Sequence, residues 1–106
     1  MFKAKNFQAA IQFYTVAIQE NPSDHTIYGN RSAAYHNTKN FVDALKDGDK
    51  CIELKSDWAK GYQRKAMALH GMRKYDEATQ AYSDGLKLDP ANAQLKSGLE
   101  SCQKDA

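Results

Sequence analysis

Residues 25–58 read HTIYGNRSAAYHNTKNFVDALKDGDKCIELKSDW and contain two runs of apolar residues at helical spacing. The first run includes Ile27, Tyr28 and Ala34, and the second includes Phe41 and Leu45. Apolar residues that recur every three or four positions indicate amphipathic helices. The segment therefore predicts two antiparallel helices joined by a short turn.

The pattern returns when the sequence is shifted by 34 residues. The shift aligns Phe7 with Phe41 and Tyr75, Ala10 with Ala44 and Ala78, Ile18 with Ile52 and Leu86, and Pro22 with Ser56 and Pro90. Helix pairs at this period, with small residues at fixed places, are the signature of the tetratricopeptide repeat. We expect an all-α, right-handed solenoid in which 1–24 form a partial repeat, 25–58 a second repeat, 59–92 a third repeat and 93–106 a capping helix. Leu95 and Leu99 would form the apolar face of that capping helix.

Small residues and capping residues support these boundaries. Alanine or glycine at the contacts between helices lets the backbones approach closely, and the expected positions are Ala44, Gly48, Ala78 and Gly85. The expected helix N-caps are Ser23 or Asp24, Ser56 or Asp57, and Asn92.

Composition excludes several classes of protein. The 106 residues are 42% hydrophobic and 26% charged, which is typical of one soluble globular domain. No apolar run is long enough to span a membrane, no secretory signal precedes the first helix, and a net charge of +2 is too small to indicate nucleic-acid binding. We expect a cytoplasmic protein in which Cys51 and Cys102 are reduced thiols.

The first repeat is expected to be incomplete. Met1 falls at the eleventh place of the 34-residue unit, so the helix from Asn6 to Glu20 would present Phe7, Ala10 and Tyr14 without their usual partner. An exposed apolar strip commonly marks an interface, which predicts a possible homodimer through residues 1–20.

The charges are sorted by helix. No acidic residue lies between Asp24 and Asp43 or between Asp57 and Asp76, where Arg31, Lys60, Arg64 and Lys65 are found, whereas the second helices of the second and third repeats each carry several. First helices of such repeats line the concave surface, so the sorting predicts a cationic groove. Asn30 lies one period before Arg64, and Lys60 lies one turn before Arg64, so these three side chains could converge on one anion. The neighbouring groove residues would be Ala33, His36, Asn37, Met67 and His70.

Two stretches, Asn30-Arg31-Ser32-Ala33-Ala34-Tyr35 and residues 58–66, resemble motifs of the tetratricopeptide-repeat cochaperones that bind heat-shock proteins. That resemblance extends over nearly the whole chain. It implies a carboxylate clamp for the Glu-Glu-Val-Asp tail of a chaperone, of the seventy-kilodalton class more than the ninety-kilodalton class. Asn30 would donate to the terminal carboxylate, Lys60 would hold that carboxylate or the aspartate side chain, and Arg64 would bond the peptide nearby. The family's clamp also uses a lysine and an asparagine from the first helix, whose places precede Met1, so we expect weakened binding.

Other functions stay open at this point. The chain could be a self-assembling scaffold or the adaptor segment of a larger enzyme, although it contains no catalytic constellation, phosphate loop or cofactor motif of its own. His36 and His70 are one period apart, but no third ligand accompanies them, so we expect no metal site.

Overall fold

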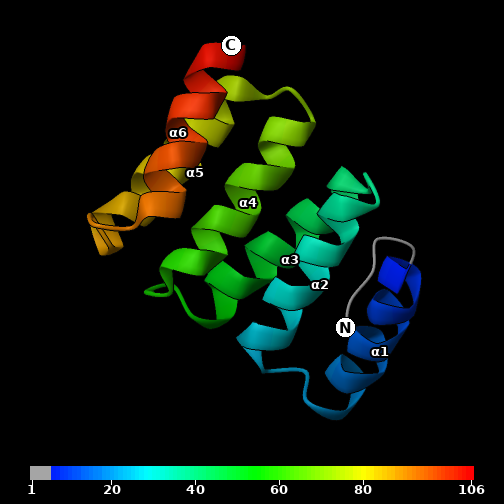
Figure 1. Ribbon diagram of the computed structural model, residues 1–106. Helices are drawn as coiled ribbons and strands as arrows, with labels where there is room; N and C mark the ends of the chain where they lie inside the picture. Colours follow the sequence, from blue (N-terminus) through cyan, green and yellow to red (C-terminus); the bar gives the residue numbers. More distant parts are fainter. Residues whose placement is uncertain (1–5) are drawn as a thin grey trace.

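The computed structural model describes residues 6–106, which form six α-helices and no strands (Figure 1). The helices are α1 (Phe7–Glu20), α2 (His25–Asn37), α3 (Phe41–Leu54), α4 (Ala59–Gly71), α5 (Tyr75–Leu88) and α6 (Ala93–Asp105). The first and last residues of α3 and α5 lie 34 and 68 positions after those of α1, and α4 and α6 follow α2 in the same way. The 34-residue period therefore sets the backbone, and the predicted all-α repeat fold is confirmed.

The helices form two layers. Helices α2, α4 and α6 contact one another in sequence and make up what we call the inner layer, while α1, α3 and α5 form the outer layer; in Figure 1, α3 and α5 lie behind the inner layer and α1 lies beside α2. Each helix also packs on the next helix along the chain. Neighbouring repeats thus share one continuous core, as expected for a solenoid.

Small residues let the layers approach closely, as the sequence predicted. Ala44 and Ala78 have no exposed surface. A Cβ atom added to Gly48 would lie 2.8 Å from the backbone nitrogen of Lys65, and one added to Gly85 would lie 3.1 Å from a methyl group of Leu95. The contact between α3 and α4 therefore has no room for a side chain at Gly48.

The helix ends follow the prediction in two cases of three. Asp24 caps α2 by accepting a hydrogen bond from the backbone of Thr26, and Asn92 caps α6 through the backbone of Leu95, both at 3.0 Å. The prediction of Ser56 or Asp57 for α4 is wrong, because the N-cap is Trp58, which makes no side-chain capping bond.

Packing explains the role of Trp58. Its indole ring lies against the backbone of Gly29, where an added Cβ would be 3.0 Å away, and contacts the ring of His25 edge-on at 4.6 Å. The indole thus fixes the start of α4 against α2 through burial, so no capping hydroxyl or carboxylate is needed there.

The turns from α2 to α3 and from α4 to α5 share an unusual backbone conformation. Lys39 and Arg73, one period apart, have φ angles of 64° and 62°. The residue that follows each of them donates its backbone N–H to a carbonyl five residues earlier, in the preceding helix. These bonds run from Asn40 to Tyr35 at 2.8 Å and from Lys74 to Leu69 at 2.9 Å. This helix-ending motif favours glycine, so two basic residues adopt it at some cost.

Helix α1 is better covered than the sequence predicted. Ala10 is 6% exposed and packs in a cluster with Ile11 and Ala34, so the expectation that Ala10 lacks a partner is wrong. Phe7 and Tyr14 are partly buried against the same cluster. The apolar side chains that α1 does expose are Phe13 at 63% and Val16 at 55%. Residues 1–5 of the proposed 1–20 interface lie outside the described residues.

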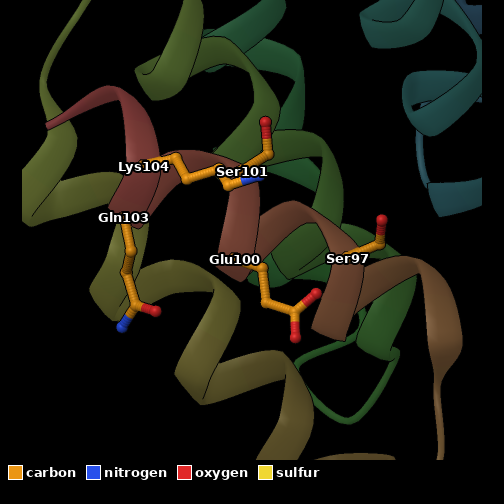
Figure 2. A pocket seen from close by; sticks show the side chains of 5 residues that line it. All are labelled: Ser97, Glu100, Ser101, Gln103 and Lys104. Carbon is orange, nitrogen blue, oxygen red and sulfur yellow. The ribbon is translucent and has the colours of Figure 1, made fainter.

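Helix α6 closes the opposite end. Leu95 and Cys102 are fully buried, and Leu99 packs partly buried against them. The outward side of α6 is a shallow polar hollow, lined by the side chains labelled in Figure 2: Ser97, Glu100, Ser101, Gln103 and Lys104. Glu100 and Gln103 stand one period after the core residues Ala66 and Leu69. A further helix packed on this surface would have to desolvate the charges of Glu100 and Lys104.

Candidate functional site

The predicted site residues lie on two adjacent helices of the inner layer. Asn30, Ala33, His36 and Asn37 are on α2, and Lys60, Arg64, Met67 and His70 are on α4. Helices α2 and α4 contact each other. Asn30, Ala33 and His36 stand one period before Arg64, Met67 and His70, so the repeat puts them at corresponding positions of the two helices, on the side that we call the inner face.

Arg64 is the most unusual residue on this face. Its Nε atom is buried and has no hydrogen-bond partner within residues 6–106. Burial lowers the pKa of the Arg64 guanidinium, although an arginine stays charged at neutral pH. A buried donor without an acceptor costs about 1 to 3 kcal/mol, so an acceptor that reaches Arg64 would recover that energy.

His36 interacts with both Arg64 and His70. Burial lowers the pKa of His36, and its electrostatic interactions with His70 and Arg64 lower it further. The three basic groups therefore share one electrostatic environment between α2 and α4. His36 contacts the ring of Phe41 edge-on at 5.4 Å, which holds the imidazole at the end of α2.

His70 has a partner inside the protein. Its Nε2 atom lies 2.7 Å from Oδ2 of Asp105 on α6, and its ring contacts Tyr75 at 5.7 Å. This nitrogen is engaged by the capping helix, so His70 links α4 to α6 as well as bordering the inner face.

The predicted site residues on α2 border a hollow between α2 and α1. Asn30, Ala33 and Asn37 line a small hollow that Phe7 and Tyr14 complete from the other side. Asn37 donates its side-chain amide to the carbonyl of Ala33 at 2.9 Å. Asn30 and Lys60 are exposed to solvent, and within the described part of the chain no hydrogen bond or ion pair joins either of them to Arg64.

Two cations that the charge pattern assigned to the groove point elsewhere. Arg31 pairs with Asp47 of α3, with an Nε to Oδ2 distance of 2.7 Å, and Lys65 pairs with Asp49 of α3 at 3.3 Å. At roughly 100° per residue, Lys65 lies about 140° around α4 from Lys60, whereas Arg64 lies only about 40° from it. The expectation that all basic residues of these helices line one groove is therefore wrong for Arg31 and Lys65.

The Arg31–Asp47 pair is a structural element that sequence reasoning missed. Asp47 is 4% exposed, and its carboxylate holds the pKa of Arg31 above its ordinary value. The available signal was an aspartate at a core-facing position of α3, three residues after Ala44 and one before Gly48. A carboxylate at such a position requires a buried cation, and Arg31 is that cation.

The described residues provide no other chemistry at this face. No three His, Cys, Asp or Glu side chains in residues 6–106 are placed to hold a metal ion. No helix in that range is long and apolar enough to cross a membrane. Cys51 and Cys102 are buried free thiols, and burial raises the pKa of Cys51 to about 12, so this thiol stays protonated at neutral pH.

The chain matches known proteins in both sequence and structure. The family model described as tetratricopeptide repeat matches residues 59–92. The chain is 50% identical to the heat shock protein sti1 homolog of Schizosaccharomyces pombe over 96% of its length, and 38% identical to the Hsp70-Hsp90 organising protein of Plasmodium falciparum over 98%. It spans only 17% and 41% of the lengths of these two curated relatives.

Solved structures with the same fold include peptide complexes. The tetratricopeptide domain of Arabidopsis OM64 is 31% identical, with a TM-score of 0.88 over 94% of this chain and 83% of that one. The first such domain of Spaghetti (RPAP3), bound to the HSP90 peptide SRMEEVD, is 27% identical with a TM-score of 0.88 over 94% and 79%. The second domain of human RPAP3, in complex with the HSP70 peptide SGPTIEEVD, is 27% identical with a TM-score of 0.87 over 93% and 82%. The chain therefore belongs to the tetratricopeptide-repeat family and is similar to its Hsp70-Hsp90 organising proteins.

Proposed function

We propose that the inner face binds the acidic C-terminal tail of a heat-shock chaperone and that Asn30, Lys60 and Arg64 hold the carboxylates of that tail. The buried, unpartnered Nε of Arg64 is the observation that carries this proposal. An internal carboxylate would have satisfied this donor if its role were structural, as Asp47 does for Arg31. Arg64 as a whole is only partly buried, so a modest shift of its side chain would let the guanidinium meet an acceptor from another molecule.

The chemistry of the tail suits these groups. A Glu-Glu-Val-Asp terminus ends in two adjacent anions, the main-chain carboxylate and the aspartate side chain. Lys60 is exposed and can follow either anion, while Asn30 can donate its amide to one oxygen. Charge-assisted hydrogen bonds contribute about 1.5 to 3 kcal/mol each, so two or three of them give measurable affinity for a short peptide.

Residues along the same face would contact the peptide upstream of its terminus. Ala33 and Asn37 line the hollow beside α1, and His36 and Met67 lie on the facing helices. His70 is held by Asp105, so it would influence peptide binding through the electrostatic potential of the groove more than by direct contact with the peptide.

The similar proteins support this kind of partner without deciding its class. Their names and complexes include both HSP70 and HSP90 peptides. We favour a tail of the seventy-kilodalton class, with the ninety-kilodalton class as the alternative; titration with the two peptides SGPTIEEVD and SRMEEVD distinguishes the classes.

The test compares a Glu-Glu-Val-Asp peptide that has a free C-terminus with the same peptide amidated, by isothermal titration calorimetry. We expect Arg64→Ala and Lys60→Ala each to weaken binding of the free acid by about tenfold or more. Lys65→Ala is the matched control, because it removes the same charge from the opposite side of α4 and should change affinity by less than about twofold. Equal affinity for the free and amidated peptides would rule out capture of the terminal carboxylate.

Self-assembly through α1 is a second candidate function, and the exposure of Phe13 and Val16 favours it. If α1 pairs with a second copy, the sedimentation coefficient should rise with concentration, and Phe13→Ser should abolish that rise. Val42→Ser is the control, since Val42 is 56% exposed on α3. A monomer at all concentrations would exclude this candidate.

A further inference from the structure

In the outer layer, the side chain of a single arginine fills the space between α1 and α3. Arg31 of α2 forms two bonds to Asp47, Nε to Oδ2 at 2.7 Å and Nη2 to Oδ1 at 2.8 Å, and its Nη1 reaches Oγ1 of Thr15 at 3.2 Å. Its guanidinium carbon lies 5.8 Å from the ring centre of Tyr28 and 5.6 Å from that of Tyr35. Both distances are within the range of a cation–π contact. We call this the first outer groove.

The corresponding groove between α3 and α5 is open. A shift of 34 residues turns each residue of the arginine site into a residue that lines a hollow of about 400 Å³, which we call the second outer groove. In that order, Thr15, Tyr28, Arg31, Tyr35 and Asp47 become Asp49, Tyr62, Lys65, Leu69 and Ala81. The volume is within the range of sites that bind small groups.

The substitutions explain why this groove is not filled from within. Ala81 replaces the buried carboxylate, so this position offers no acceptor to a cation in the groove. Lys65 cannot form the planar, two-bond arrangement of an arginine, and its Nζ turns to Asp49 at the rim at 3.3 Å. The aromatic floor is kept in part, because Tyr62 stands where Tyr28 supports Arg31.

We propose that the second outer groove binds an arginine side chain of a partner protein. The guanidinium would lie over Tyr62, as that of Arg31 lies over Tyr28, and its stem would pack on Leu69 and Leu45. The lining carries three carboxylates, Asp49, Glu77 and Asp84, and two of them already have a cation nearby, since Asp49 pairs with Lys65 at 3.3 Å and Asp84 with Lys87 at 3.7 Å. Glu77 has no ion pair within residues 6–106 and is the carboxylate that would meet the guanidinium.

This site is separate from the proposed peptide site. Tyr62, Lys65 and Leu69 lie on the side of α4 roughly opposite Lys60 and Arg64, given about 100° of rotation per residue. The body of α4 stands between the two faces. The domain could therefore hold an acidic tail on its inner face and a basic side chain on its outer face at the same time.

Titration of the intact chain with N-acetyl-arginine-N-methylamide, followed by ¹⁵N–¹H NMR, tests the proposal. We expect saturable shifts of the amides of Tyr62, Lys65 and Ala81 with a dissociation constant of about 1 to 10 mM, as befits one side chain. The matching citrulline compound has the same shape without the charge, and it should bind at least about tenfold more weakly. Equal binding by citrulline, or shifts that gather elsewhere on the protein, would overturn the proposal.

A variant that closes the groove gives an internal control. Lys65→Arg combined with Ala81→Asp rebuilds the Arg31–Asp47 pair in the second outer groove and should abolish arginine binding while the melting temperature stays level or rises. A second double variant, Glu77→Gln with Asp84→Asn, should weaken arginine binding at least about threefold. This test stays informative even if the first variant fails to fold. Lys60→Ala should leave arginine binding unchanged, so failure of this proposal and failure of the peptide proposal are distinguishable. Unaltered binding in either groove variant contradicts an arginine site.

Discussion

Removal of Asp47 should leave a guanidinium stranded between the layers, and a double-mutant cycle can measure that effect. The side chains of Arg31 and Asp47 are 18% and 6% exposed, so the pair is largely out of water. Breaking a buried pair from one side costs about 3 to 5 kcal/mol. In the Asp47→Ala variant, Thr15 remains as a partner of Arg31 and part of the guanidinium reaches solvent. We therefore expect this variant to lose about 3 kcal/mol of the free energy of unfolding.

The double variant Arg31→Lys/Asp47→Ala reproduces the natural pair Lys65 and Ala81. A lysine can extend its ammonium group to water along its flexible stem, so the double variant should lose only about 1 to 1.5 kcal/mol. Urea unfolding monitored by far-UV circular dichroism gives these values, provided that the slope of the free energy against urea is the same for all variants. A double variant that loses the sum of the two single losses would refute the reasoning, since additive losses mean that the two side chains do not interact.

Three further changes test the backbone and the inner face. Gly48→Ala should lower the free energy of unfolding by about 1 to 2 kcal/mol, because the steric cost against the backbone of α4 exceeds the gain in helix propensity; a higher melting temperature would contradict that close approach. Lys39→Gly and Arg73→Gly should each raise it by about 0.5 to 1 kcal/mol through relief of a positive φ, and a loss in either urea titration would show that the turn is not strained. The pKa of His36 is lower in the folded chain, so the unfolded chain binds more protons near pH 6; stability should therefore fall as the pH drops from about 7 to 5. His36→Gln should flatten this dependence in thermal melts, and an unchanged profile would assign it to other groups.

The fold could be predicted from the sequence because a solenoid makes few contacts between distant parts of the chain. Each helix packs on its neighbours, so the 34-residue period in Phe7, Phe41 and Tyr75 reports the tertiary structure as well as the secondary structure. The misplaced cap at Trp58 shows the limit of local rules. Burial of an indole against Gly29 outweighed the capping preference of the two polar residues before it.

The candidate site was harder to predict because charge sorting by helix carries no information about direction. Arg31 and Arg64 are both basic residues of inner-layer helices, yet they are 33 positions apart, one short of the repeat. That single residue turns the side chain by about 100°, so Arg31 enters the outer layer while Arg64 stays with Asn30 on the inner face. The place of each arginine within the 34-residue repeat therefore distinguishes Arg31 from Arg64, whereas a count of charges in each helix does not.

One position of the repeat has a different role in each of three successive helices of the inner layer. Arg31 fills its groove, Lys65 leaves the next groove open and pairs at the rim, and Leu99, one period further, packs against the core of the capping end. The bounds of these helices repeat every 34 residues, so the difference lies in the side chains. An aspartate or an alanine on the facing helix decides whether a cation is held from within or could be accepted from outside. In a repeat fold, the positions where one unit departs from its neighbours are therefore the places to seek binding, since residues that the period keeps constant are accounted for by packing.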